Sequence, residues 1–425
     1  MASSDGLINE LEWRGLIAAQ SNREGLAEHL SGGSRRLYCG FDPTADSLHI
    51  GSLVPLLLLR RFQVAGHRPI LLLGGATGLI GDPSFKDDER SLNDEDTVAI
   101  WVDSLRRQVE PFLDFSGNSG ALIVNNLDWT REMNVVSFLR DIGKHFSVNA
   151  MIQRDSVRNR LERAEQGISY TEFSYMLLQG MDFLELAKTE DCLVQIGGQD
   201  QWGNIVSGVD LIRRHLSKEA YALTHPLVTK ADGTKFGKTA SGAVWIDPKK
   251  TSPYSFYQFW LNSSDADVVN YLRYFTFLEQ EQINELDEQT RAAPEQRAGQ
   301  KALAAEVTAL VHGQEAVVSS QRISAVLFGG DPRDLTQADL QQLALDGMSA
   351  SYAQPGSGLL SVMVEAGLAK STGEARKLVQ GGGVRLNGEP VMDPREEIDF
   401  KQALFGEYFV LRKGKKAYHL LQKAV

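Results

Sequence analysis

The segment from Leu37 to Ser52 constrains the fold more than any other stretch of this chain. It begins with the apolar run Leu37-Tyr38-Cys39, which predicts a buried strand. The chain then breaks at Gly40 and Pro43 into a polar loop, and the apolar run over 53–59 predicts a packed helix. A strand, a polar loop and a helix in this order are typical of open α/β sheets, which bind ligands at the carboxyl ends of their strands.

The end of this loop has the composition of an anion site. Gly51 allows a phosphate to approach the backbone, and we expect the start of the helix to supply unpaired N–H groups for it. His49 adds a further donor. On this short pattern alone, a structural histidine and a ligand-binding histidine are equally good interpretations.

Further apolar runs alternate with helical patterns over the first 225 residues or so of the chain. Candidate strands follow at 69–75, 121–126, 192–196 and 226–229, and helices are expected over 1–33, 51–66, 94–115 and most of 130–188. Strands that alternate with helices predict a parallel, doubly wound sheet.

The pattern changes in the second half. Residues 252–328 show helical periodicity without strands, which predicts an all-α domain. Residues 329–357 contain Gly, Pro, Ser and Asp and predict a linker. The segment from 358 onward predicts a small helix–helix–strand unit, in which Ser371 to Glu374 fits a capping box and a strand covers 384–386.

Composition narrows the functional class. The 425 residues suffice for two to four domains, and the net charge of −11 argues mildly against a nucleic-acid partner for the chain as a whole. Residues 356–425, however, hold 11 Lys and Arg against 8 Asp and Glu, a balance of +3. No apolar run is long enough to span a membrane, no signal peptide is evident, and two cysteines are too few for a disulfide framework or zinc site. We therefore expect a cytoplasmic protein.

Two glycine-rich segments partly match known phosphate-binding motifs. Gly75-x-x-Gly78-x-x-Gly81 lacks the G-x-G opening of a dinucleotide fingerprint, and the segment from Gly233 to Thr239 has three residues where a P-loop needs four. Taken alone, Lys235 and Lys238 fit a solvated loop. Asp82 and Asp200 follow strands and fit either ligand binding or helix capping.

The motifs taken together change this interpretation. The words DPTADSLHIG and KFGKT resemble the HIGH and KMSKS signatures of class I aminoacyl-tRNA synthetases. His49 and Lys235, the first residues of the two signatures, lie 186 positions apart. Within that class the chain resembles bacterial tyrosyl-tRNA synthetases, in the words LYCGFDPTADSLHIG, GGATGLIGDPS, NNLDW, QIGGQDQWGNI and PLVTKADGTKFGKT. The C-terminal unit resembles the RNA-binding fold of a ribosomal small-subunit protein.

The resemblance implies an α/β architecture in several parts. It predicts a doubly wound, Rossmann-like catalytic domain over 1–228, a KMSKS-type loop over 229–245 and an α-helical tRNA-binding domain over 246–328. The linker over 329–357 and a small C-terminal α+β RNA-binding domain over 358–425 complete the chain.

The resemblance also assigns roles toward a tyrosine substrate. It implies that Tyr38 and Asp182 bind the phenolic hydroxyl, that Asp82, Tyr175 and Gln179 hold the α-amino group, and that Gln201 lies beside the carboxylate. Tyr175 could instead be a core residue, and the alternative for Tyr38 and Asp182 is a mutual hydrogen bond in the core.

A second set of residues is implied for ATP and the adenylate. These are Cys39 and Asp200 at the ribose, Thr44 and His49 at the triphosphate, Gly40, Asp42, Gly51 and Gly198 around the nucleotide, and Lys235, Lys238 and Thr239 closing over it, with Lys86 and Arg90 on a mobile loop. Cys39 alone is most simply a buried small residue. The last position of the first signature is Ser52 in place of His, which we interpret as a tolerated variant that still donates a hydrogen bond.

The implied reaction joins tyrosine to tRNA in two steps through tyrosyl-adenylate. ATP brings Mg²⁺ with it, no metal site of the protein is expected, and the partners are ATP, L-tyrosine, tRNA(Tyr) and a second copy of the chain, with Tyr170 near the dimer contact. Three alternatives remain: a tryptophan-specific synthetase, a catalytically inactive RNA-binding relative, and a small-molecule nucleotidyltransferase, which explains neither the helical domain nor the basic C-terminal end.

Overall fold

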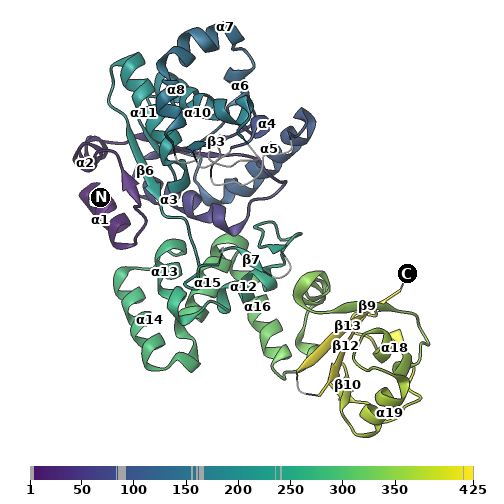
Figure 1. Ribbon diagram of the computed structural model, residues 1–425. Helices are drawn as coiled ribbons and strands as arrows, with labels where there is room; N and C mark the ends of the chain where they lie inside the picture. The colour runs from purple at the N-terminus through teal and green to yellow at the C-terminus, as the bar shows by residue number, and fades with distance from the viewer. Residues whose placement is uncertain are drawn as a thin grey trace. The chain divides into compact units, whose positions relative to one another are not determined.

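The structure is a computed structural model that describes residues 4–82, 84, 92–154, 157–158, 161, 167–234, 236–239, 242–414 and 416–424. The chain divides into two compact units (Figure 1). The first comprises residues 1–246 and 265–288, and the second comprises 247–264 and 289–425.

The first unit is built on a six-stranded sheet. The strand order is β1 (Ala19–Gln20), β6 (Tyr221–His225), β5 (Val194–Gly198), β2 (Arg36–Phe41), β3 (Arg68–Leu73) and β4 (Leu122–Asn125). The strands from β6 to β4 are parallel, and β1 pairs antiparallel with β6. The chain progresses from β2 to β4 in one direction and from β5 to β6 in the other, so the doubly wound sheet is confirmed, and its switch point lies between β2 and β5.

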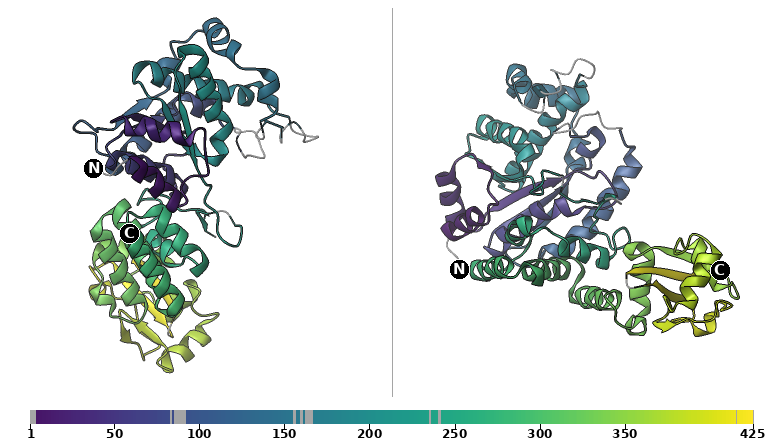
Figure 2. Two further views of the ribbon diagram at one scale, coloured as in Figure 1. Left: turned by 90° about the vertical axis from the view of Figure 1, so that its left-hand side faces the viewer. Right: turned by 60° about the horizontal axis from the view of Figure 1, so that its bottom comes forward.

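Helices cover both faces of this sheet (Figures 1 and 2). On one face Tyr38, Ile70 and Leu72 are buried in one apolar cluster with residues of α10 (Tyr170–Thr189) and α11 (Trp202–Leu216). The other face is covered by α3 (Leu53–Val64) and α5 (Glu95–Val109). Because successive side chains of a strand point to opposite faces, buried strands with helices on both sides have continuous apolar runs.

Two expectations for the first unit are wrong. The predicted helix over 1–33 is two helices, α1 (Ser4–Trp13) and α2 (Arg23–Ser31), with β1 between them. Gly15 has a φ of +72° where α1 gives way to the following turn, and the Asn22 side chain caps α2 by accepting from Gly25 N–H. The last strand is β6 over 221–225, not 226–229, because Pro226 has no N–H to continue the ladder.

The helical segment after the sheet is shared between the two units. Helices α12 (Pro253–Leu261), α15 (Ala298–His312) and α16 (Gln314–Leu327) belong to the second unit. In contrast, α13 (Asp265–Phe275) and most of α14 (Gln280–Ala292) belong to the first. Helical structure is therefore observed as predicted over 252–328, but the segment does not form one compact body.

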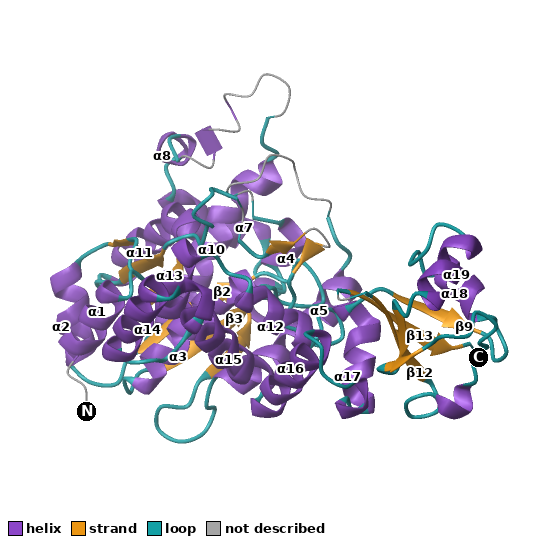
Figure 3. Cartoon of the chain, turned by 90° about the horizontal axis from the view of Figure 1, so that it is seen from below, coloured by secondary structure: helices purple, strands orange, loops and turns teal. Residues whose placement is uncertain are grey.

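The C-terminal part of the second unit contains a five-stranded sheet, which is more than the predicted helix–helix–strand unit. Its order is β11 (Glu389–Pro390), β10 (Val384–Leu386), β12 (Tyr408–Lys413), β13 (Ala417–Lys423) and β9 (Ala350–Ala353). Helices α18 (Leu359–Glu365) and α19 (Thr372–Gln380) lie on one face of it (Figure 3). The Ser371 side chain accepts from Glu374 N–H at the start of α19, as expected, but the Glu374 carboxylate accepts from Lys370 N–H and does not complete the predicted capping box.

The predicted linker over 329–357 is wrong as a description of this segment. It contains α17 (Gln337–Gln342), which opens with a capping box between Thr336 and Asp339, and strand β9, which pairs in parallel with β13. Tyr408, Val410 and Leu420 on the second face of the sheet are buried against residues of α16 and α17. Among the described residues, no helix is long and apolar enough to cross a membrane.

Candidate active site

A cavity of about 410 Å³ lies at the carboxyl ends of β2 and β5, within the first unit. It brings together most of the residues that the sequence singles out. These are Tyr38, Cys39, Gly40, Asp42, Thr44, His49, Gly51, Ser52, Asp82, Tyr175, Gln179, Asp182, Gly198, Asp200 and Gln201. This is the position at which open α/β sheets bind ligands.

Five predicted residues are not placed in the cavity. Lys86, Arg90 and Lys235 lie outside the described residues. Lys238 and Thr239 form β7 (Lys238–Thr239), which pairs antiparallel with β8 (Gly242–Ala243).

Two buried polar side chains in the cavity do not satisfy each other. Asp182 is 3% exposed, and its oxygens accept from Asn126 Nδ2 at 2.9 Å and Trp129 Nε1 at 2.8 Å. Tyr38 is 1% exposed, and its hydroxyl has no hydrogen-bond partner within the described part of the chain. The core interpretation, a bond between Tyr38 and Asp182, is therefore wrong.

Opposing effects act on the pKa of Asp182. Burial raises the pKa of this carboxyl group to about 7, although the hydrogen bonds from Asn126 and Trp129 lower it. Burial also raises the pKa of the Tyr38 hydroxyl well above its ordinary value, and the nearby Asp182 adds to this effect. At neutral pH the cavity thus holds a neutral phenol and a carboxyl group that changes its charge near that pH.

Asp42, which directly follows β2, accepts two short hydrogen bonds. Its Oδ2 accepts from the Tyr175 hydroxyl at 2.6 Å, and its Oδ1 accepts from Thr77 Oγ1 at 2.6 Å. Gly74 gives the space for this arrangement, because a Cβ there would lie 2.0 Å from Asp42 Oδ1. Tyr175 is buried and also lines the cavity.

Two further carboxylate groups, of Asp82 and Asp200, bind the side chain of Gln201. Gln201 Nε2 donates to Asp82 Oδ2 at 2.7 Å and to Asp200 Oδ2 at 3.1 Å. Asn204 Nδ2 donates to Gln201 Oε1 at 3.2 Å and so fixes the orientation of the amide. Burial raises the pKa of Asp200, and burial with the nearby Asp200 raises that of the Cys39 thiol to about 12. Cys39 is therefore a neutral thiol at neutral pH.

The backbone of residues 49–52, the HIGS segment, does not provide the unpaired N–H groups that the sequence predicts for a phosphate. The N–H groups of Gly51 and Ser52 donate to His49 Nδ1 and His49 O, at 3.0 and 2.9 Å. The N–H of Ile50 donates to Val244 O at 3.0 Å. These N–H groups are thus not unpaired donors for a phosphate. Because Nδ1 of His49 accepts, the neutral ring carries its proton on Nε2.

Residues 244–246, which follow the KFGKT segment, pair with residues 48–50, and the KFGKT segment itself packs on α13. Ile246 N–H donates to Leu48 O at 2.9 Å, and Val244 N–H donates to Gly237 O at 3.1 Å. The ring of Phe236 stacks on Phe275 with centroids 5.3 Å apart. Gly237 has a φ of +83°, a conformation in which a side chain is strained.

Sequence reasoning missed three residues of this site. Asn126 and Trp129 hold Asp182, and Gln195 lines the cavity with a buried Oε1 that no described residue meets. The word NNLDW, which contains Asn126 and Trp129, was a usable signal, whereas Gln195 in an apolar strand had none. In the described ranges no group of three or more His, Cys, Asp and Glu side chains could hold a metal ion.

Comparison with known proteins agrees with this geometry. The family model "tRNA synthetases class I (W and Y)" matches residues 31–329, and the model "Tyrosine--tRNA ligase SYY-like C-terminal domain" matches residues 339–421.

Curated relatives span nearly the whole chain. The chain is 55% identical to a tyrosine–tRNA ligase of Aliivibrio salmonicida over 99% of both chains. It is 56% identical to one of Klebsiella pneumoniae over 99% of this chain and 98% of the relative.

Among solved structures, a C-terminally truncated mitochondrial tyrosyl-tRNA synthetase of Aspergillus nidulans is similar with a TM-score of 0.68 and 30% identity. The match covers 76% of this chain and 94% of that one. A tryptophanyl-tRNA synthetase of Plasmodium falciparum, at 13% identity, shares the fold. The chain belongs to the tyrosine–tRNA ligase family of class I aminoacyl-tRNA synthetases.

Proposed function

We propose that this chain activates L-tyrosine with ATP to tyrosyl-adenylate and pyrophosphate, and then transfers tyrosine to the 3′-terminal adenosine of tRNA(Tyr). The observation that carries the substrate assignment is the pair Tyr38 and Asp182. A buried hydroxyl that no described residue meets and a buried carboxylate line one cavity. A phenol both donates and accepts hydrogen bonds, so its O–H can donate to Asp182 and its oxygen can accept from Tyr38.

The α-amino group of tyrosine would lie near the opposite set of side chains. Asp82 supplies a carboxylate, the Tyr175 oxygen can accept while its O–H donates to Asp42, and Gln179 has a buried Oε1 without a described partner. An ammonium group has three donors and no acceptor, so these three acceptors match its needs. Gln201, which donates to Asp82, would lie beside the tyrosine carboxylate.

ATP would occupy the remainder of the cavity. We assign Cys39 and Asp200 to the ribose, Gly40, Asp42, Gly51 and Gly198 to the surroundings of the nucleotide, and Thr44, His49 and Ser52 to the phosphate side. Lys86, Arg90, Lys235, Lys238 and Thr239 are assigned to the phosphates by family resemblance. Mg²⁺ is part of the ATP substrate, because carboxylate and phosphate oxygens are its preferred ligands.

The chemistry needs no general base. The tyrosine carboxylate is ionised at neutral pH and attacks the α-phosphorus, while pyrophosphate leaves. Catalysis then depends on placing the two reactants and on stabilising charge on the phosphate oxygens as it builds up. His49 fits this role, because it lines the cavity and the bond from Gly51 N–H to Nδ1 orients its ring. Cys39 does not act as a nucleophile, because its thiol is protonated.

An exposed apolar surface supports a homodimer. It lies on α7 (Val135–Ser137), the following π-helix, α8 (Val148–Ile152) and the start of α10. Its members are Val135 at 69% exposure, Val136 at 67%, Leu139 at 49%, Val148 at 56%, Ile152 at 41% and Tyr170 at 71%. Apolar side chains at such exposure on neighbouring elements mark a protein–protein interface. We propose that a second copy of the chain covers them.

The C-terminal part would bind tRNA(Tyr), which its balance of +3 over residues 356–425 supports. We retain the helical segment over 246–328 as a further tRNA-binding part. A cytoplasmic location is also proposed, because both cysteines are free and buried, which suits a reducing compartment.

The tryptophan-specific and the inactive alternatives fit less well. Tryptophan offers a single N–H donor and no acceptor, so it would leave Tyr38 unsatisfied. An inactive RNA-binding relative would have no need for the Asp82–Gln201–Asp200 and Tyr175–Asp42 networks. Tyrosine-dependent ATP–pyrophosphate exchange tests the proposal, with phenylalanine and tryptophan as controls. Exchange with tyrosine alone supports it, and exchange with tryptophan or with none of the three contradicts it.

A further inference from the structure

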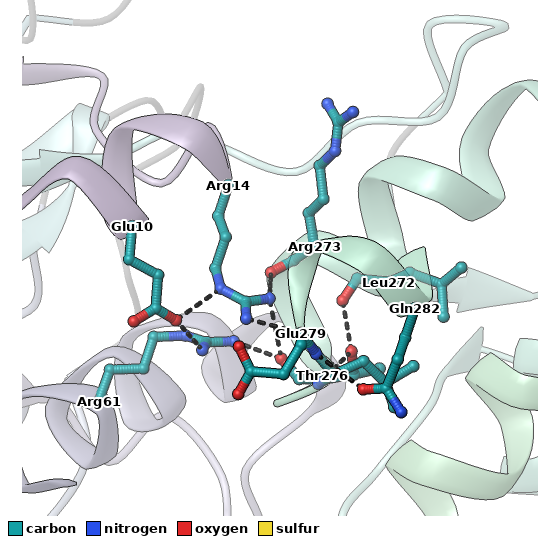
Figure 4. Close-up of polar contacts among 9 residues, drawn as sticks. Glu10, Arg14, Arg61, Leu272, Arg273, Thr276, Glu279 and Gln282 are labelled. Carbon is teal, nitrogen blue, oxygen red and sulfur yellow. Dashed lines mark hydrogen bonds and ion pairs between the residues drawn. The ribbon is translucent and has the colours of Figure 1, made fainter. Parts of the chain in front are cut away.

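Outside the cavity, two buried arginines from distant parts of the chain meet (Figure 4). Arg14 follows α1 and is 2% exposed, and Arg61 lies on α3 and is 3% exposed. Glu10 on α1 joins them, because its Oε1 accepts from Arg14 Nε at 2.8 Å and from Arg61 Nη1 at 3.2 Å. One carboxylate therefore faces two guanidinium groups.

Both arginines bind the carboxyl end of α13. Arg14 donates to Arg273 O at 3.2 Å and to Leu278 O at 2.8 Å. Thr276 O accepts from Arg14 at 3.4 Å and also from Arg61 Nη2 (Figure 4). The last carbonyls of a helix lack partners within the helix and carry partial negative charge, so cations are favourable there.

This arrangement is costly if its only purpose is stability. Burial and the neighbouring Arg14 lower the pKa of Arg61 to about 9, despite Glu10. Apolar residues of similar volume often replace buried charges without loss of stability. A guanidinium group, however, holds several carbonyl oxygens in a fixed geometry that an apolar side chain cannot reproduce.

The end of α13 that the arginines bind is also the surface on which the KFGKT segment packs. Thr276 directly follows Phe275, and the ring of Phe275 stacks on Phe236 at an interplanar angle of 19°. Tyr271, one turn earlier, contacts the same Phe236 ring with centroids 5.1 Å apart. Near the other end of the helix, Asp267 accepts from Ala231 N–H at 2.8 Å. Helix α13 thus holds the loop on both sides of Lys235.

We propose that Arg14 and Arg61 are positioning residues for adenylate formation, which fix α13 and through Phe275 and Phe236 place the KFGKT lysines at the phosphates of ATP. This inference rests on the proposed function of the cavity. Neither arginine lines the cavity. Each would act on the reaction through the packing of Phe236 on α13.

The test compares Arg61→Lys and Arg14→Lys with a matched control. Arg35 donates from Nε to His29 O near the end of α2, at 2.8 Å, so Arg35→Lys removes the same kind of bond from a helix that does not touch the loop. We expect each of the first two variants to slow adenylate formation at least about tenfold, because small displacements of catalytic groups have large effects on rate. The dissociation constant of tyrosine should stay unchanged, and Arg35→Lys should form adenylate at the wild-type rate.

A double variant separates positioning from a merely structural role. If Arg61 acts through Phe236, the variant Arg61→Lys with Phe236→Leu should be no slower than Phe236→Leu alone, whereas independent effects multiply. Multiplying effects, or a wild-type adenylation rate in Arg61→Lys, would overturn the inference. If Arg61→Lys does not fold, Arg14→Lys carries the same comparison. Absence of tyrosine-dependent exchange in the wild-type chain would instead contradict the proposed function.

Discussion

Tyr38 and Asp182 have complementary hydrogen-bonding needs within one cavity. Tyr38 offers a buried hydroxyl that no described residue meets, while Asp182 already has two donors and retains capacity to accept. A substrate phenol satisfies both, and a phenyl ring satisfies neither. On the proposed assignment, selectivity at this site would come from the cost of leaving buried polar groups unpaired.

The variant Tyr38→Phe should reduce the preference for tyrosine over phenylalanine. Loss of one buried hydrogen-bonding partner is worth about 1–3 kcal/mol, so we expect the ratio of kcat/KM values in pyrophosphate exchange to fall roughly 5- to 150-fold. Tyr257→Phe removes a buried hydroxyl in the second unit and should leave the ratio unchanged. An unchanged ratio in Tyr38→Phe together with a lower Tm would show that Tyr38 is only a core residue.

Tyrosine affinity should depend on the charge of Asp182. Since its pKa is raised to about 7, the carboxylate that accepts the phenolic O–H is lost as the pH falls below that value. We expect the dissociation constant of tyrosine to rise about tenfold per pH unit well below pH 7. Stability changes in the opposite direction: a raised pKa contributes stability below the unfolded-state pKa, and this contribution is lost as the pH rises through 7.

Trp129→Phe provides the matching check on this pH dependence. The variant removes a hydrogen bond that lowers the pKa of Asp182, so the midpoint for tyrosine binding should move to higher pH. Calorimetric titration from pH 5.5 to 8.5 would measure both midpoints. A flat profile in the wild-type chain would exclude Asp182 as the acceptor.

The turn into α3 shows how an element places the His49 side chain. Gly51 lies against the His49 ring, and a Cβ there would come within 2.7 Å of His49 Cε1. The 3₁₀ turn over Ile50–Ser52 uses its own N–H groups on His49, so the segment fixes the imidazole instead of binding phosphate with its backbone.

Gly51→Ala should therefore displace His49 without closing the tyrosine pocket. We expect adenylate formation to slow at least about tenfold, with tyrosine affinity unchanged, as measured by stopped-flow fluorescence and equilibrium dialysis. Gly358→Ala is the control, because a Cβ there meets nothing within 4 Å. Equal rates in both variants would contradict the placement of His49 by this glycine.

Elements were predictable where the local signal agreed with the fold. Buried strands such as β2 and β3 have continuous apolar runs, and both were found within two residues of their predicted bounds. The strand β9 was not predictable, because its four residues become a strand only by pairing with β13, some seventy residues later. The backbone pairing of Gly51 and Ser52 was equally out of reach, since it depends on the ring orientation of His49.

For the site, the sequence predicts which residues lie together but not how they bond to one another. Motif words located most of the residues that line the cavity, because the carboxyl ends of parallel strands gather residues that are distant in sequence. Motifs do not show which partner each side chain takes. The bonds of Asp182 to Asn126 and Trp129, and of Tyr175 to Asp42, required coordinates.

At the scale of the whole chain, we propose that the first unit forms the adenylate and that the C-terminal part of the second unit binds tRNA. All residues that line the cavity belong to the first unit, while the basic C-terminal segment belongs to the second. The C-terminal sheet is not a pendant domain on a loose linker, because Tyr408, Val410 and Leu420 form one core with residues of α16 and α17.

Removal of residues 356–425 should spare pyrophosphate exchange and abolish charging of tRNA. The truncation also removes Tyr408, Val410 and Leu420 from the core that α16 and α17 share with the sheet, so the thermal transition of the second unit should weaken or disappear. Differential scanning calorimetry and the two activity assays measure these effects together. Parallel loss of exchange and charging would refute the division of tasks.

Aminoacylation by the full-length chain tests the central claim most directly. Purified chain would be incubated with ATP, Mg²⁺, unfractionated bacterial tRNA and one labelled amino acid at a time, and acid-precipitable label would be counted. We predict ATP-dependent attachment of tyrosine, with tryptophan and phenylalanine at background. Attachment of tryptophan at a comparable rate, or binding of tRNA without attachment of any of the three, would contradict the account.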